Sequence, residues 1–150
     1  MARLPATLLA LLLVSSSAHA LMRRDLTSRY GRANWSQSAP GSTIVTTEQF
    51  VPEPGIGLTA KYDDHGNVKE IRITPLGPET DERGTRVVPI NVAEKLLNQV
   101  VPRKQQPAEG TSGSTGACHH FTTATKVDLT IMRVFSDCDP KGLNVTVTWR

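Results

Sequence analysis

Aromatic residues are scarce in this 150-residue chain, which has two tryptophans, two tyrosines and three phenylalanines. Glycoside hydrolases hold two carboxylic acids at a fixed separation across a cleft, which aromatic side chains commonly line. The acidic residues Glu79, Asp81 and Glu82 fall instead in a polar stretch without an aromatic residue. We interpret that stretch as a solvated loop.

A strong charge of one sign is also missing. Lysine and arginine number 17 against 14 acidic residues, so the formal net charge is only +3. Nucleic-acid-binding domains typically concentrate basic residues on one face. The small and dispersed excess gives no reason to expect a nucleic-acid partner.

Only one long apolar run occurs, Leu8–Val14, and it is too short to span a bilayer, which takes about 20 residues. Arg3 precedes the run, and Ala18 and Ala20 put small residues at the positions that a signal peptidase requires. We therefore predict a signal peptide at residues 1–20, export to the periplasm or the medium, and no membrane span after cleavage.

Cysteine is limited to Cys118 and Cys138, both in the predicted exported domain, residues 21–150. An isolated pair in an oxidising compartment is most simply a disulfide. Two thiolate metal ligands are the alternative, but no second Cys-x-x-Cys half exists. We predict the disulfide, which would stabilise the fold by about 3 kcal/mol in the chain-entropy model.

Familiar catalytic and phosphate-binding motifs are absent as well. The serines near Gly110–Gly116 form no Gly-x-Ser-x-Gly elbow and no Gly-Lys-Ser/Thr phosphate loop. We predict a flexible loop at 103–117, serving either as a binding loop or as a linker. Asp63–Asn67 lacks the spacing of a calcium-binding EF-hand loop, and its residues are typical of a tight turn.

The remaining sequence carries clear strand and helix patterns. Ile56–Tyr62 and Val68–Thr74 alternate apolar and polar residues around that turn, which predicts a hairpin, and a phase slip after Val68 predicts a bulge. Asn91 and Glu94 form a capping-box pattern that predicts a helix ending before Pro102. The other predicted elements are a helix at Arg24–Tyr30 and strands at Thr43–Val51, Val127–Met132 and Leu143–Trp149.

These elements predict a single α+β domain. Its mostly antiparallel sheet would have about five strands, with one main helix packed on it and a short N-terminal helix.

Cys118-His119-His120 is the most conspicuous cluster of potential ligands. Neighbouring residues on an extended chain point to opposite faces, so one metal ion would need further ligands from elsewhere. We interpret His119 and His120 as surface histidines beside a disulfide, with a weak alternative as metal ligands, and we expect no cofactor. The cluster Arg23, Arg24, Arg29 and Arg32 fits a solvated helix face, with an acidic partner as the alternative.

Two functional hypotheses follow. The first is a non-enzymatic binding or interaction domain for an unknown protein or envelope partner or a small ligand, acting through sheet edges or the 103–117 loop. The second is a small secreted hydrolase or metal-dependent enzyme that uses His119 or His120 with an acid such as Asp128. The first is favoured because no residues predict a convergent catalytic pocket.

The chain also resembles a group of small exported proteins of soil bacteria that have no assigned function. The resemblance rests on four features: Arg29-Tyr30-Gly31, the hairpin Tyr62…Gly66…Ile71-x-Ile73, a helix running into Val101-Pro102, and the Cys118…Cys138 pair before a terminal hairpin. It implies export and a single domain, and it carries over no functional residue.

Overall fold

The computed structural model describes residues 20–77, 80–81, 84–108 and 110–150. Apart from Ala20, the predicted signal peptide at residues 1–20 lies outside the described residues. The helices are α1 (Arg23–Tyr30), α2 (Ile90–Val100) and the short 3-10 helix η1 (Arg103–Gln105). None of the helices in the described ranges has both the length and the apolar character that a membrane crossing requires.

Eight antiparallel strands form the main sheet, in the order β1-β2-β3-β4-β10-β9-β8-β7, and two short strands, β5 and β6, form a separate hairpin. The strands are β1 (Trp35–Ser38), β2 (Thr46–Glu53), β3 (Ile56–Tyr62), β4 (Val68–Pro75), β5 (Thr80–Asp81), β6 (Gly84–Thr85), β7 (Thr111–Gly116), β8 (His119–Lys126), β9 (Leu129–Ser136) and β10 (Gly142–Trp149).

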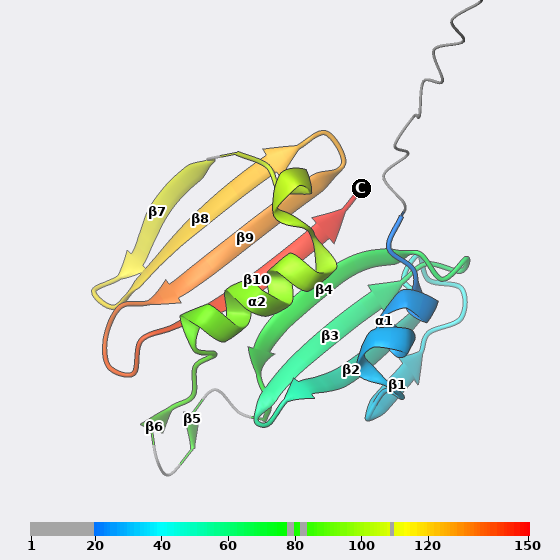
Figure 1. The fold of residues 1–150 in the computed structure, drawn as a ribbon, viewed down its shortest axis with the longest axis horizontal. Helices are drawn as coiled ribbons and strands as arrows, with labels where there is room; N and C mark the ends of the chain where they lie inside the picture. Colours follow the sequence, from blue (N-terminus) through cyan, green and yellow to red (C-terminus); the bar gives the residue numbers. More distant parts are fainter. Residues whose placement is uncertain (1–19, 78–79, 82–83, 109) are drawn as a thin grey trace, which may run out of the picture.

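The main sheet consists of two similar halves. Each half begins with a helix and continues as four consecutive antiparallel strands, so that the last strands of the halves, β4 and β10, pair at the centre. Val145 lies opposite Ile73 and Val147 opposite Ile71 in this pairing. Both helices lie on the same face of the sheet (Figure 1).

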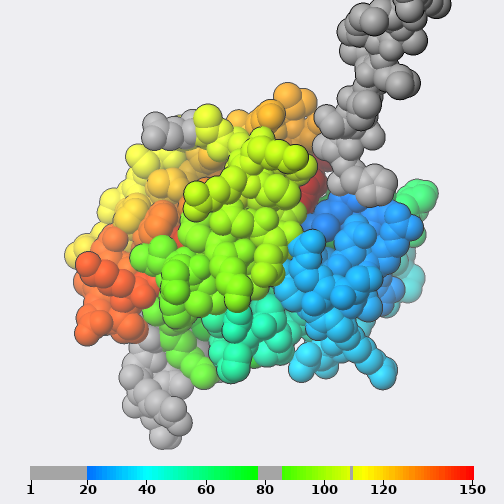
Figure 2. All heavy atoms as spheres, in the orientation of Figure 1, coloured from blue at the N-terminus to red at the C-terminus, as the bar shows by residue number. Residues whose placement is uncertain are grey.

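The hydrophobic core lies between this face and the two helices. Strand β3 buries every second residue from Ile56 to Tyr62, the alternation expected of a strand with one covered face. Helix α2 buries a stripe at helical spacing, Ala93, Leu96, Leu97 and Val100. Burying each large aliphatic side chain stabilises the fold by roughly 1.5–3 kcal/mol. Figure 2 shows side chains of the two helical segments, blue and yellow-green, spread over this face.

The capping-box pattern takes Asn91 as the N-cap of this helix, but helix α2 begins two residues earlier. Its N-cap is Pro89, and Asn91 lies inside the first turn without making a side-chain cap. The prediction of Asn91 as the N-cap was therefore wrong. Pro89 cannot donate a backbone hydrogen bond, but at this position none is needed, because the first N–H groups of a helix have no partner within it.

No helix of the described residues covers the opposite face, which we call the threonine face. The strand register places on it the residues that alternate with the core residues. Its centre holds one charge cluster, in which Glu70 lies 3.0 Å from Lys61 and 2.7 Å from Arg72. The threonines on this face are Thr47, Thr59, Thr74, Thr111, Thr123, Thr125, Thr130, Thr146 and Thr148.

The predicted fold class was wrong. The structure is dominated by an eight-stranded antiparallel sheet rather than by about five strands with one main helix. The prediction missed β1, β7 and β8. Strands β1 and β7 are the two edges and are almost fully exposed, so their sequences need no apolar alternation. Strand β8 buries only Ala124.

Part of the segment 103–117, predicted as a flexible loop, has regular structure. Residues 103–105 form η1, and Thr111–Gly116 forms β7. Val127, predicted as the start of a strand, lies in the β8–β9 turn and is 81% exposed.

The hairpin prediction was confirmed in detail. Strands β3 and β4 pair around the Asp63–Asn67 turn. Lys61 lies opposite Glu70 and Tyr62 opposite Val68, so Lys69 is the extra residue of a bulge. The bulge restores the phase that the sequence loses after Val68, and the same face stays buried along the strand.

Candidate functional site

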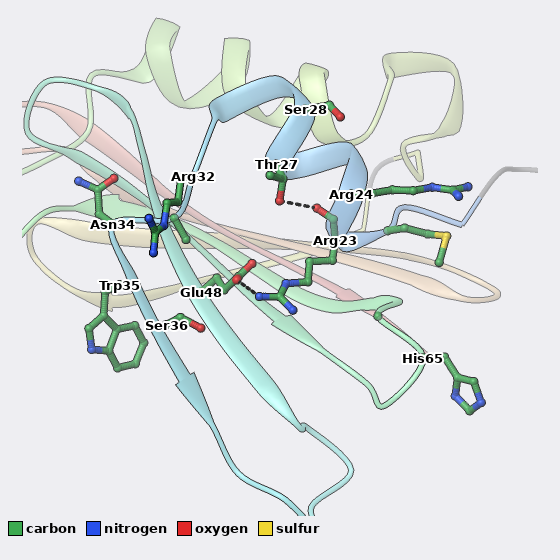
Figure 3. Close-up of a pocket in the computed structure, with 13 residues that line it drawn as sticks. Arg23, Arg24, Thr27, Ser28, Arg32, Asn34, Trp35, Ser36, Glu48 and His65 are labelled. Carbon is green, nitrogen blue, oxygen red and sulfur yellow. Dashed lines mark hydrogen bonds and ion pairs between the residues drawn. The ribbon is translucent and has the colours of Figure 1, made fainter.

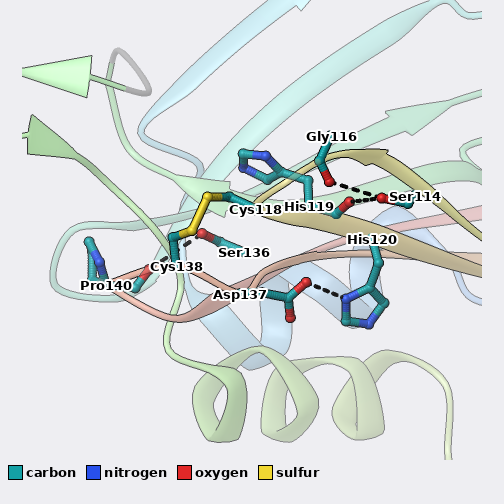
Figure 4. A network of polar contacts seen from close by, with 9 residues as sticks. All are labelled: Ser114, Gly116, Cys118, His119, His120, Ser136, Asp137, Cys138 and Pro140. Atoms are coloured by element: carbon teal, nitrogen blue, oxygen red, sulfur yellow. Dashed lines mark hydrogen bonds and ion pairs between the residues drawn. A yellow bond between two sulfur atoms is a disulfide. The ribbon is translucent and has the colours of Figure 1, made fainter.

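The predicted disulfide between Cys118 and Cys138 is present, with the two Cα atoms 5.2 Å apart. It joins the β7–β8 turn to the loop between β9 and β10 (Figure 4). The Asp137 N–H donates to the Cys118 carbonyl at 2.8 Å beside it. With both sulfur atoms in the disulfide, neither is available as a thiolate ligand.

His119 and His120 point in opposite directions, as the sequence predicted (Figure 4). The His120 ring stacks on Phe135 with 4.5 Å between ring centroids, and its Nδ1 lies 2.6 Å from Asp137 Oδ2. His119 lines a small pocket of about 60 Å³ on the other side. The structure therefore does not bring the two weak metal-ligand candidates together.

The acid suggested for a hydrolase, Asp128, lies in the turn at the far end of β8, and His120 pairs with Asp137 instead. Ser114 faces His120 in the strand register. Its hydroxyl group, however, lies 2.9 Å from the Gly116 carbonyl and 3.2 Å from the His119 carbonyl. Because carbonyls only accept, the Ser114 proton points to the main chain, which does not suit a serine nucleophile.

Asp63, Asp64 and His65 are the group of potential metal ligands that the described part of the chain brings together. Asp63 has a structural role, since its side chain accepts hydrogen bonds from the backbone N–H groups of His65 and Asn67. Burial would raise the pKa of Asp63, but the hydrogen bonds from Asn67 and His65 outweigh it and lower the pKa. These contacts confirm the predicted turn.

A pocket of about 900 Å³ opens between α1 and the strands β1 and β2. We call it the arginine pocket. Figure 3 shows the side chains of Arg23 and Arg32 directed toward the space around Glu48, whereas Arg24 and His65 point away. Trp35, which is 48% exposed, borders the pocket at β1. It lies opposite Gln49, so its ring projects on the other face of the sheet, away from Glu48.

The floor of the arginine pocket is an ion pair between Arg23 and Glu48. Glu48 is only 5% exposed, while half of the Arg23 side chain remains accessible. The hydrogen bond from Arg23 to Glu48 raises the pKa of Arg23. The guanidinium also lies 5.9 Å from the centre of the Tyr62 ring. Arg23 is therefore held in place by two contacts and keeps accessible N–H groups on the pocket side.

Tyr62 lies beneath this pair and is fully buried. Burial raises the pKa of Tyr62, and the nearby Glu48 carboxylate raises it further. Among the described residues, neither Tyr62 Oη nor Glu48 Oε2 has a hydrogen-bond partner of normal geometry. The floor thus combines a charged pair with polar atoms that are incompletely satisfied.

From the sequence, the arginines Arg23, Arg24, Arg29 and Arg32 were interpreted as a solvated helix face. The stronger signal was Glu48, which occupies the buried phase of β2 between Thr46 and Phe50. A carboxylate at a core position requires a cationic partner. That requirement identifies a special site but does not say which arginine supplies the charge.

Comparison with protein-family models, with curated proteins and with solved structures found no match. The function is therefore inferred from the residues of the site.

Proposed function

We propose that the protein is an exported, non-enzymatic binding domain that holds a small organic anion in the arginine pocket. The observation that carries the proposal is the Arg23–Glu48 pair at the pocket floor, in which the carboxylate is buried and the guanidinium is half accessible, with Arg32 beside it. The ligand class is a small carboxylate, such as a sugar acid.

Charge supports an anionic ligand. Glu48 neutralises one guanidinium group, so the second, Arg32, leaves the convergent part of the pocket with a positive excess. A guanidinium group presents N–H donors in a fork that matches a carboxylate. Because Glu48 holds Arg23 in position before the ligand arrives, less side-chain entropy is lost on binding.

Trp35 borders the pocket from the other face of β1. Its indole is therefore a fluorescent reporter beside the site and not a surface on which the ligand stacks.

Binding is favoured over the hydrolase hypothesis because the His120 region offers little room for a substrate. The pocket beside His119 encloses only about 60 Å³, and His120 is stacked on Phe135. The arginine pocket, in contrast, has neither a serine–histidine pair nor two facing carboxylates among its described lining residues. Export is supported by the signal-peptide pattern and by the disulfide, which is compatible with an oxidising compartment.

Tryptophan fluorescence tests the proposal directly. In a Trp149→Phe background, Trp35 is the one remaining tryptophan. We expect saturable emission changes with D-glucuronate and weaker ones with inorganic phosphate, and none with neutral D-glucose. Arg32→Gln should weaken glucuronate binding about tenfold, or ~1.4 kcal/mol, the size of one charge-assisted hydrogen bond.

The matched control is Arg103→Gln, which removes the same charge from η1, outside the pocket. Equal loss of binding in the two variants would mean that the effect is general electrostatics. Failure of both glucuronate and phosphate to change Trp35 emission would contradict an anion site here.

A further inference from the structure

The free edge of the sheet at β7 lacks the features that usually prevent edge strands from pairing. Its six residues, Thr111–Gly116, include no charge, no proline and no side chain larger than threonine, and five of the six are exposed. Natural edges are commonly blocked by lysine, proline, bulges or short length. Strand β7 has only a register shift between Ser114 and Gly116, near its end. The other edge, β1, is four residues long.

The sequence of β7 is also self-complementary. Residues 111–115 read Thr-Ser-Gly-Ser-Thr in both directions. If two copies pair antiparallel about Gly113, then Ser112 faces Ser114 of the second copy, and Thr111 faces Thr115. Each residue then faces one of the same type, and the contact is isologous because each pair of facing residues occurs twice about the two-fold axis. Threonine and serine pairs across strands form favourable hydrogen bonds.

Gly113 and Phe121 shape the centre of this edge. A Cβ atom at Gly113 would lie 2.6 Å from the Phe121 ring, so the ring occupies the space above the glycine, on the threonine face. In the paired arrangement the Phe121 rings of both copies lean over the two facing glycines. Aromatic cover of an edge glycine stabilises strand pairing.

We propose that two copies of this protein associate through β7, antiparallel about Gly113, into one continuous sheet. The two-fold axis of such a pair is perpendicular to the sheet, so the helices of both copies lie on the same side. Since β1 is at the opposite edge from β7, the two arginine pockets lie at the outer ends of the pair and on that same side. The pair presents two sites to one surface, which raises avidity for a multivalent anion.

The size of the contact sets the expected affinity. A strand of six residues buries less than the roughly 1,600 Å² of a standard stable interface. We therefore expect a dissociation constant in the micromolar range, about 10–100 µM, rather than a permanent dimer.

Sedimentation velocity of the purified protein over 1–300 µM measures this association. We expect a monomer at the lowest concentrations and a growing dimer fraction above them. The double variant Ser112→Asp/Ser114→Asp should remain monomeric, because like charges then face each other across the axis. Mixing it with Ser112→Lys/Ser114→Lys should restore a dimer through opposite charges. Gln37→Asp/Ser38→Asp on β1 is the matched control and should dimerise like the original chain.

Amide chemical shifts of the unmodified protein give a second readout that needs no variant. On concentration from 10 to 300 µM, we expect shifts confined to β7 and the facing residues of β8. If the protein stays monomeric over the whole concentration range, the proposal is overturned. Strand β7 would then be open to pairing with a strand of a different protein. The proposal is also overturned if the mixed Asp and Lys variants stay monomeric or if the shifts occur at β1. The arginine pocket test is independent, because Trp35 reports ligand binding in the monomer.

Discussion

Tyr62 shows how one residue links the core to the arginine pocket. Its ring is part of the buried face of β3, while its hydroxyl lies near Glu48 at the pocket floor. Such a position stabilises the fold through the ring and gives the hydroxyl an environment poor in hydrogen-bond partners.

The raised pKa of Tyr62 predicts instability at alkaline pH. An unfolded tyrosine loses its proton near pH 10, whereas native Tyr62 keeps it, so the unfolded state is favoured increasingly as pH rises above about 10. We expect Tyr62→Phe to reduce this loss and to change the free energy of unfolding at pH 7 by less than about 1 kcal/mol. Urea unfolding at pH 7, 9 and 11 measures both effects.

Tyr30→Phe is the matched comparison. Burial also raises the pKa of Tyr30, but its hydroxyl donates to Gln99 Oε1 at 2.8 Å. This variant should therefore cost about 1 kcal/mol at pH 7. An unchanged alkaline slope in Tyr62→Phe would show that Tyr62 does not cause the effect.

At the scale of elements, sequence-based prediction succeeded for strands with one buried face and failed for exposed strands. The hairpin from Ile56 to Thr74 was predicted with its bulge because each strand has one buried face and therefore alternates. The edge strand β7 was missed because its side chains are exposed on both faces. The pocket was missed because α1, β1 and β2 form it together, and no local pattern encodes their arrangement.

The disulfide is the element-scale feature with the clearest energetic prediction. Cys118→Ser/Cys138→Ser should lower the free energy of unfolding by about 3 kcal/mol, since a bridge across 20 residues restricts the unfolded chain. The original chain under reducing conditions should show the same loss in urea unfolding, and the double variant should not respond to reductant. Equal stability of the oxidised protein and the double variant would contradict a stabilising role.

For the whole molecule, the decisive feature is the central pairing of β4 with β10. The buried residues of both halves form one hydrophobic cluster, which includes Leu26 of α1 and Leu96 of α2. Neither half encloses a core of its own, so the halves are expected to unfold together in one cooperative transition.

Separate expression of the halves tests this unity. Residues 20–77 and 84–150 each expose a central strand edge and half of the core when alone. We expect no cooperative thermal transition for either fragment and a recovered transition when equimolar fragments are refolded together, followed by circular dichroism. A cooperative transition in one isolated fragment would show that the molecule contains two independent folding units.

The threonine face has a consequence for how this protein can change. Its side chains project from the strands on the side opposite to α1 and α2, while the alternating residues form the core. Substitutions of its exposed side chains leave the buried packing intact, and most surface substitutions change stability by less than about 0.5 kcal/mol. The scaffold can therefore accept a new set of side chains across a broad, rigid platform without losing its fold. In evolutionary terms, this face is where new binding residues can arise with the smallest loss of stability.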